Sequence, residues 1–112
     1  MSPEIPLEVD CQTVAGQLGQ APEIFLLDCR EADEFAIAKI AGAELLPMSE
    51  LMARVQELEP YRNRPLVVHC HHGGRSLKVA QWLRNQGFPQ AQSMAGGIDQ
   101  WAREIDTSIA RY

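Results

Sequence analysis

The chain has 112 residues, of which 46% are hydrophobic, and its formal net charge is −5. This length suits one domain with a single apolar core, and we expect residues 1–112 to form it. The acidic balance argues against nucleic acid as a partner. No apolar run approaches the ~20 residues that cross a bilayer, and residues 1–4 lack the pattern of a signal peptide. We therefore expect a cytoplasmic protein with no membrane partner.

The hydrophobic pattern alternates short apolar strands with amphipathic helices. In the first half, we expect strands at 4–9, 24–27 and 42–47, and helices at 11–18, 31–38 and from Ser49 to Pro60. Asp10 and Ser49 are the expected N-caps of two of these helices, and Met52 is expected to fill the core. Asp28 and Arg30 follow the second strand directly and are expected to form a structural charge pair, with contact to the functional site as the alternative.

The second half continues the alternation. We expect strands at 66–70 and 91–94, and helices from Ser76 to Gln86 and at 98–105, while the tail to Tyr112 shows no pattern. His69 is expected to be a hydrogen-bonded histidine of the core. Strands that alternate with helices in this way predict an α/β fold, with a central, mainly parallel five-stranded sheet and helices on both faces.

A strand, a tight loop and a helix start meet between Leu66 and Ser76. Cys70 ends the strand, at the edge where open α/β sheets bind ligands. Gly73 and Gly74 permit a loop whose successive amides turn inward to bind an anion, and the following helix N-terminus adds positive potential. Such surroundings lower the pKa of a free cysteine from ~8.5 to roughly 3.5–7.5. We therefore expect Cys70 to be a reactive thiolate rather than an inert buried cysteine.

The other two cysteines have less distinctive surroundings. An odd number of cysteines without a secretory signal argues against a disulfide framework. The spacing of the cysteines matches no zinc motif, and the histidines at 69, 71 and 72 lie too close in sequence to enclose one ion, so we expect neither metal nor cofactor. Cys11 is expected to be structural. Cys29 is expected to fill space, although a second interpretation makes it a resolving thiol for Cys70.

Charge is distributed unevenly along this acidic chain. The segment from Pro60 to Ile98 contains no Asp or Glu, but it holds all three histidines and half of the Lys and Arg residues. We expect this basic segment to attract a small anionic substrate. Arg75 lies in the loop itself and is expected to contribute, whereas the other arginines of the segment are expected to be ordinary surface charges.

Three stretches of this sequence resemble signature motifs of the rhodanese family, and they occur in the same order as in the family. Cys70-His71-His72-Gly73-Gly74-Arg75 is similar to the family's active-site loop, which is written CxxGxR. The stretch from Leu26 to Ala43 resembles the upstream signature, and the stretch from Met94 to Trp101 resembles the C-terminal one. Two departures affect only substrate preference: Lys39 stands where the family often has histidine, and Cys29 where it usually has an aliphatic residue.

This resemblance implies a rhodanese-like fold and a sulfurtransferase activity. Cys70 would take a sulfane sulfur from a donor such as thiosulfate, become a persulfide, and pass the sulfur to cyanide or a thiol. The amides of residues 71–75 would cradle the persulfide and the departing sulfite, and Arg75 would bind the anionic donor. His71 and His72 would face the substrate mouth, with simple solvation as the alternative.

Two other functions remain open from the sequence. A cysteine-based phosphatase uses a similar loop, but with five residues between Cys and Arg to hold a tetrahedral phosphate. Here four residues separate Cys70 from Arg75, which suits a single sulfur atom better. The domain could also serve mainly as a persulfide relay, an interaction module that delivers sulfur to a protein partner.

Overall fold

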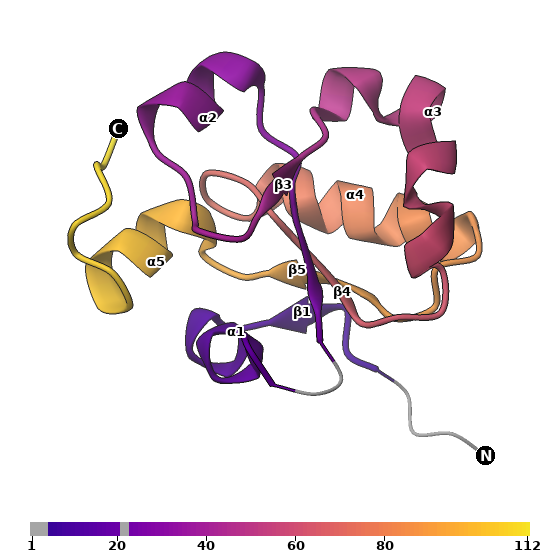
Figure 1. Ribbon diagram of the computed structural model, residues 1–112, viewed down its shortest axis with the longest axis horizontal. Coiled ribbons are helices and arrows are strands. Elements are labelled where there is room, and N and C mark those ends of the chain that lie inside the picture. The colour runs from indigo at the N-terminus through magenta and orange to yellow at the C-terminus, as the bar shows by residue number, and fades with distance from the viewer. Residues whose placement is uncertain (1–4, 21–22) are drawn as a thin grey trace.

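Five parallel strands form the centre of the protein, in a computed structural model that describes residues 5–20 and 23–112. The strands are β1 (Glu8–Val9), β2 (Phe25–Asp28), β3 (Glu44–Leu45), β4 (Leu66–His69) and β5 (Ala91–Met94). Their order in the sheet is β1-β5-β4-β2-β3, and every neighbouring pair is parallel (Figure 1). The predicted five-stranded α/β fold is therefore confirmed. The expected first strand is shorter than predicted, and its residue Glu4 lies outside the described residues.

Helices connect these strands. They are α1 (Cys11–Gln17), α2 (Ala32–Ile37), α3 (Leu51–Arg54), α4 (Gly74–Asn85) and α5 (Gly97–Glu104), with 3₁₀ segments η1 (Met48–Glu50) and η2 (Val55–Tyr61) on either side of α3. The side chain of Asp10 caps α1 by accepting a 2.7 Å hydrogen bond from the amide of Thr13, as expected. In the described part of the chain, no helix combines the length and apolar character needed to cross a bilayer.

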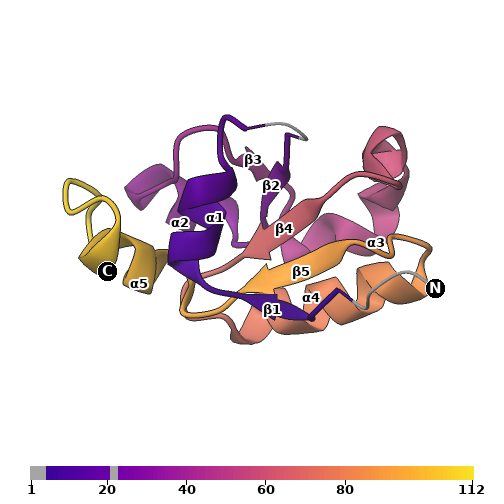
Figure 2. The same cartoon turned by 90° about the horizontal axis from the view of Figure 1, so that it is seen from below.

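Apolar side chains cover the sheet on both faces. One cluster joins the sheet to α3, η2 and α4, with Leu51, Leu58 and Leu83 among its buried members. The other joins it to α1 and α5, through Val14 and Trp101. Figure 2 shows α1 and α4 on opposite sides of the sheet. The central strands β2 and β4 are buried along their whole length, as their unbroken apolar runs predict.

The segment between β3 and β4 differs from the single helix that we expected. Only four residues are α-helical, and η2 continues through Pro60 to Tyr61. The narrow face that contacts the sheet keeps Leu51 buried but turns Met52 to solvent, where it is 77% exposed, so its predicted core position is wrong. The N-cap prediction for Ser49 is also wrong: its hydroxyl donates a 2.7 Å hydrogen bond to Glu31 of the neighbouring loop.

A buried ion pair lies at the carboxyl end of β2. The guanidinium of Arg30 donates to both carboxylate oxygens of Asp28, at 2.7–3.2 Å, and neither side chain is exposed. Arg30 also donates to the carbonyl of Ala38 at 2.5 Å, so the pair ties β2 to the segment after α2. The predicted structural charge pair is confirmed. His69 is buried beside it, but among the described residues neither ring nitrogen has a hydrogen-bond partner, contrary to expectation.

Candidate active site

Cys70 follows β4 directly and lies at the bottom of the loop that leads into α4. Its sulfur accepts hydrogen bonds from two backbone amides, those of Gly73 at 3.1 Å and Ser76 at 3.3 Å, and lies 3.5 Å from the Ser76 hydroxyl. The side chain is almost fully buried, with 1% exposure. Of the predicted amide cradle at residues 71–75, the amide of Gly73 contacts the sulfur, and the second amide comes from Ser76, one residue beyond that range.

These contacts favour the thiolate. The pKa of Cys70 is lowered to about 4, first by hydrogen bonding from the Cys29 thiol and then, against the opposing effect of burial, by the hydroxyl and amide of Ser76 and the amide of Gly73. The predicted low pKa therefore has a physical basis in this structure. By contrast, burial and nearby carboxylates raise the pKa of Cys11 to about 11. Cys11 is buried, and its thiol lies against two backbone carbonyls, which supports its expected structural role.

The conformation of the loop depends on Gly73 and on the start of α5. Gly73 has φ +110°, and a Cβ there would lie 3.3 Å from the amide nitrogen of Gly96, so a larger residue is disfavoured twice. The amide of Ile98 donates to the carbonyl of Cys70 at 2.9 Å, and that of Asp99 to the carbonyl of His71 at 3.1 Å. The amino end of α5 thus fixes the carbonyls of Cys70 and His71 at the start of the loop.

Sequence reasoning missed a pair of buried serines behind the loop. Ser76, in the first turn of α4, lies 2.7 Å from the hydroxyl of Ser93 on β5 and also contacts the carbonyl of Gly73 at 3.2 Å. Both serines are fully buried. The available signal was a polar residue on the apolar face of each element, which in a buried position needs a partner.

Arg75 lies at the edge of the loop and forms an ion pair. Both of its terminal nitrogens donate to the carboxylate of Glu34 in α2, at 2.7 and 2.9 Å. The pair lowers the pKa of Glu34 to about 2, chiefly through these hydrogen bonds, and raises that of Arg75. The guanidinium is therefore already neutralised, so binding of an anionic donor by Arg75 stays a prediction. Glu34 was not predicted to belong to the site.

The C-terminal segment returns to the loop beside α2 (Figure 1). The ring of Tyr112 stacks on His71 with 4.0 Å between centroids, and His71 stacks in turn on His72 at the same distance. The Tyr112 hydroxyl accepts a 2.7 Å hydrogen bond from Arg30 and donates one of 3.0 Å to Glu34. His71 is half-buried and His72 is exposed, so the two histidines lie together at the outer side of the loop. Their contact with a substrate stays a prediction.

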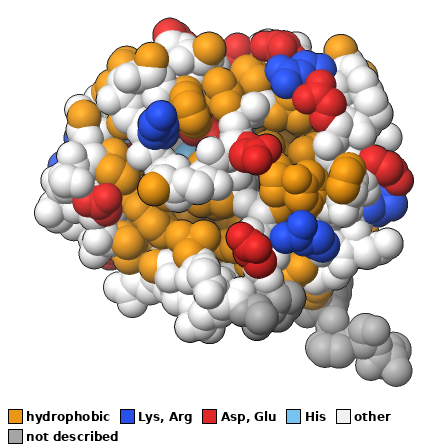
Figure 3. All heavy atoms as spheres, in the orientation of Figure 1, with side chains coloured by type: hydrophobic (Ala, Val, Ile, Leu, Met, Phe, Trp, Pro, Cys, Tyr) orange, Lys and Arg blue, Asp and Glu red, His pale blue; other side chains and the backbone are white. Residues whose placement is uncertain are grey.

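Folding brings acids back to the segment that lacks them in sequence. Glu34 neutralises Arg75, Glu59 pairs with Arg62 at 2.7 Å, and Asp99 lies 4.0 Å from His72. On the face shown in Figure 3, the Lys and Arg side chains lie apart from one another, among acidic and apolar ones. The hydrogen bonds that Cys70 receives from the Cys29 thiol, from Ser76 and from the amide of Gly73, and not a free basic patch, are therefore what favour its thiolate. The described residues contain no group of three or more His, Cys, Asp or Glu that could hold a metal.

The lowered pKa of Cys70 predicts unusual reactivity at acid pH. Alkylation of Cys70 by iodoacetamide should keep its rate as the pH falls from neutral, and should drop to half near a pH of about 4. Ser76→Ala should move this midpoint up by about one to two units, because a hydrogen bond to a charged group contributes ~1.5–3 kcal/mol. Mass mapping of the alkylated site, with circular dichroism to monitor folding, measures both. A wild-type midpoint near the ordinary ~8.5 would contradict this account.

The same difference in pKa couples folding to pH. The pKa of Cys70 is lower in the folded chain than in the unfolded one, so its ionisation stabilises the fold. This contribution is complete above the unfolded pKa of ~8.5. It is lost progressively as the pH falls toward about 4.

Comparison with known proteins agrees with this geometry. The sequence model of the rhodanese-like domain family matches residues 11–104, so the chain belongs to the rhodanese family. The chain is similar to a thiosulfate sulfurtransferase, GlpE, of Coxiella burnetii, with 33% identity over 86% of this chain and 88% of that protein. The solved structure of the human single-domain sulfurtransferase TSTD1 superposes with a TM-score of 0.77 at 25% identity, covering 88% of this chain and 97% of that one.

A plant relative shows the same domain inside a longer protein. The chain is 34% identical to the rhodanese-like/PpiC domain-containing protein 12, chloroplastic, of Arabidopsis thaliana, over 80% of its own length. It spans only 31% of that relative. The shared part is therefore the domain that contains Cys70, and any further activity of the longer protein belongs to that protein.

Proposed function

We propose that this chain transfers sulfane sulfur through a persulfide on Cys70. The observation that carries the proposal is the environment of Cys70. Its sulfur is buried and accepts hydrogen bonds from the amides of Gly73 and Ser76, and the pKa of the thiol is lowered to about 4. A thiolate of low pKa is present at neutral pH and is also a good leaving group when the sulfur is passed on. The same amides are available to hold the charge of a persulfide.

The proposed reaction has two displacement steps. The Cys70 thiolate attacks the outer sulfur of thiosulfate; a bond forms between the two sulfurs, and sulfite leaves with the electron pair of the broken S–S bond. The acceptor, cyanide or a thiolate, then attacks the outer sulfur and regenerates the Cys70 thiolate. The remaining loop residues, 71–75, would surround the donor, with His71 and His72 at the outer side.

Intact-mass measurement after thiosulfate treatment tests the proposal. The reduced protein should gain the mass of one sulfur atom, Cys70→Ser should gain none, and Cys11→Ser should behave as the wild type because Cys11 lies in the other apolar cluster. A folded wild-type protein that gains no sulfur at any time after mixing would overturn the proposal. Turnover of an aryl phosphate that is abolished in Cys70→Ser would instead assign the loop to phosphatase chemistry.

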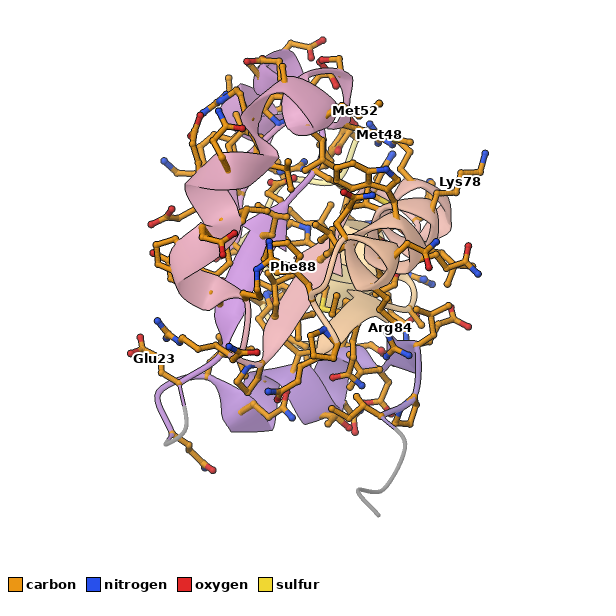
Figure 4. All side chains as sticks on the ribbon, turned by 90° about the vertical axis from the view of Figure 1, so that its right-hand side faces the viewer. Glu23, Met48, Met52, Lys78, Arg84 and Phe88 are labelled. Atoms are coloured by element: carbon orange, nitrogen blue, oxygen red, sulfur yellow. The ribbon has the colours of Figure 1, made fainter. Side chains whose placement is uncertain are left out.

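One surface feature favours the alternative, a relay to a protein acceptor. A pocket of about 290 Å³ opens between α3 and α4, lined by Met48, Leu51, Met52, Lys78, Val79 and Trp82. Figure 4 shows the side chains of Met48, Met52 and Lys78 at the same end of the molecule. Lys78 and Trp82 lie one and two turns along α4 from Arg75, so the pocket continues the helix face that begins at the loop. Methionines are common at surfaces that bind varied apolar partners.

If the pocket binds a protein acceptor, a change at Met52 should affect the rate of sulfur transfer to a protein but not to a small acceptor. Met52→Glu should slow sulfur transfer to a peptide with a cysteine between apolar and acidic residues, while transfer to cyanide stays unchanged. Arg54→Glu serves as the control, because it adds an acid to the same helix outside the pocket lining. Equal rates for the wild type and Met52→Glu with the peptide would remove this function from the pocket.

A further inference from the structure

Cys29 and Cys70 lie opposite each other on neighbouring strands. β2 and β4 pair in parallel, with Asp28 in register with His69, so the next residues along the two strands are Cys29 and Cys70. The amide of Cys29 extends the ladder by donating to the carbonyl of His69 at 3.1 Å. Paired strands lie about 4.8 Å apart, which is within the Cα separations of ~4.4–6.8 Å that a disulfide spans.

Both side chains also point to the same side of the sheet. Cys29 and Cys70 belong to the apolar cluster beneath α3 and α4, with exposures of 0% and 1%. Cys11, the remaining cysteine, belongs to the cluster on the opposite face. Within the fold, Cys29 is therefore the thiol available to react with Cys70 without entry of any other molecule.

The two thiols influence each other's pKa in the resting protein. Hydrogen bonding to Cys70, together with burial, raises the pKa of Cys29, and the same interaction is the largest cause of the low pKa of Cys70. The proton stays on Cys29 as long as Cys70 is the thiolate. When Cys70 carries a sulfur atom, its negative charge no longer lies on the atom next to Cys29, so the largest cause of the raised pKa of Cys29 is weakened, while burial still keeps its proton in place until the sulfur attacks.

We propose that Cys29 resolves the Cys70 persulfide when no acceptor arrives, and so gives the protein a second activity, the release of sulfide. The inference rests on the proposed function, because it starts from the persulfide. The Cys29 sulfur attacks the Cys70 sulfur, and a Cys29–Cys70 disulfide forms. The bond to the outer sulfur breaks, and that sulfur leaves with the electron pair and takes up the Cys29 proton, so the negatively charged persulfide releases the hydrosulfide ion, HS⁻.

This step balances without an external oxidant. The sulfane sulfur is reduced to sulfide, and the two cysteines are oxidised to the disulfide. An external thiol then reduces the disulfide and returns the protein to its starting state by ordinary exchange. The loaded protein thus has two outcomes, transfer to an acceptor or release of sulfide, and the second leaves Cys70 unable to accept sulfur until it is reduced.

A single-turnover experiment tests this inference. Reduced protein receives one equivalent of thiosulfate without acceptor, and intact mass and free sulfide are followed over time. The wild type should gain the mass of one sulfur, then lose it and finish two hydrogens lighter than the reduced protein, with one sulfide released per chain. Peptide mapping should place the new disulfide between Cys29 and Cys70. Cys11→Ser, the matched control, should behave identically.

Removal of Cys29 should trap the loaded form. Cys29→Ser, and Cys29→Ala if the serine variant does not fold, should keep the added sulfur and release no sulfide. A wild-type protein that keeps its sulfur as long as Cys29→Ser, or one that releases sulfide without forming the disulfide, would overturn the inference. If no variant takes up sulfur at all, the proposed function fails first, so the two failures are distinguishable.

Discussion

Asp28→Ala should destabilise the protein by about 3–5 kcal/mol, because it leaves the buried guanidinium of Arg30 without its counter-charge. Arg30 is fully buried, and three of its hydrogen bonds go to the Asp28 carboxylate. Asp28 also accepts a 3.0 Å bond from the amide of Arg30, which fixes the turn after β2. Urea denaturation, followed by circular dichroism, measures the loss in unfolding free energy.

An exposed pair provides the matched control. Glu59 and Arg62 form a 2.7 Å salt bridge, but their side chains are 60% and 35% exposed. Glu59→Ala should therefore cost no more than about 1 kcal/mol. The double variant Asp28→Leu, Arg30→Met should recover much of the stability lost in Asp28→Ala, since it removes the uncompensated charge. If Asp28→Ala were as mild as Glu59→Ala, the pair would not be the buried anchor described here.

Gly97→Ala should damage the fold and the Cys70 loop together. Gly97 begins α5 with φ +60°, and a Cβ there would meet the carbonyl oxygens of Cys70, at 2.5 Å, and of His71. The left-handed conformation costs a non-glycine residue ~1–2 kcal/mol and overpacking costs ~1–3, so we expect a loss of about 2–5 kcal/mol. Because the clash falls on the loop, the alkylation midpoint of Cys70 should also rise toward the value of an ordinary thiol.

Gly16 in α1 is the control for the same exchange. It lies within the helix, and no atom lies within 4 Å of a Cβ built there. Gly16→Ala should stabilise the protein by roughly 0.5–1 kcal/mol, because alanine loses less conformational freedom in a helix. A Gly97→Ala protein with wild-type stability and an unchanged Cys70 midpoint would show that α5 does not constrain the loop.

The features that the sequence predicts well are local. Val67 and Val68 belong to an unbroken apolar run, which gives a buried strand, and the glycines after Cys70 give a tight loop with inward amides. The contacts that it does not predict join residues that are distant in sequence. Glu34 and Arg75 are 41 residues apart, and Tyr112 and Glu34 are 78 apart, so no spacing indicates that they meet.

Tertiary contacts decide the role of residues whose local chemistry is ambiguous. Ser49 has the chemistry of a helix cap, but Glu31 of the preceding loop lies within reach and takes its hydroxyl. For Cys29 the sequence left two interpretations open, and its full burial supports the space-filling one. The pairing of β2 with β4 also places it next to Cys70, which the resolving-thiol interpretation requires.

The hydrogen bonds from α5 to the loop mean that the site around Cys70 is ordered before a donor binds. Because the amides of Ile98 and Asp99 already hold the carbonyls of Cys70 and His71, the cradle around the sulfur is ordered by folding and not by the donor. A preorganised site loses no binding energy to loop ordering, and its dipoles need not reorient as charge moves during the reaction. Thiosulfate, the proposed donor, has only a few atoms and little binding energy to contribute, so the proposed reaction would benefit from a site that is ordered before binding.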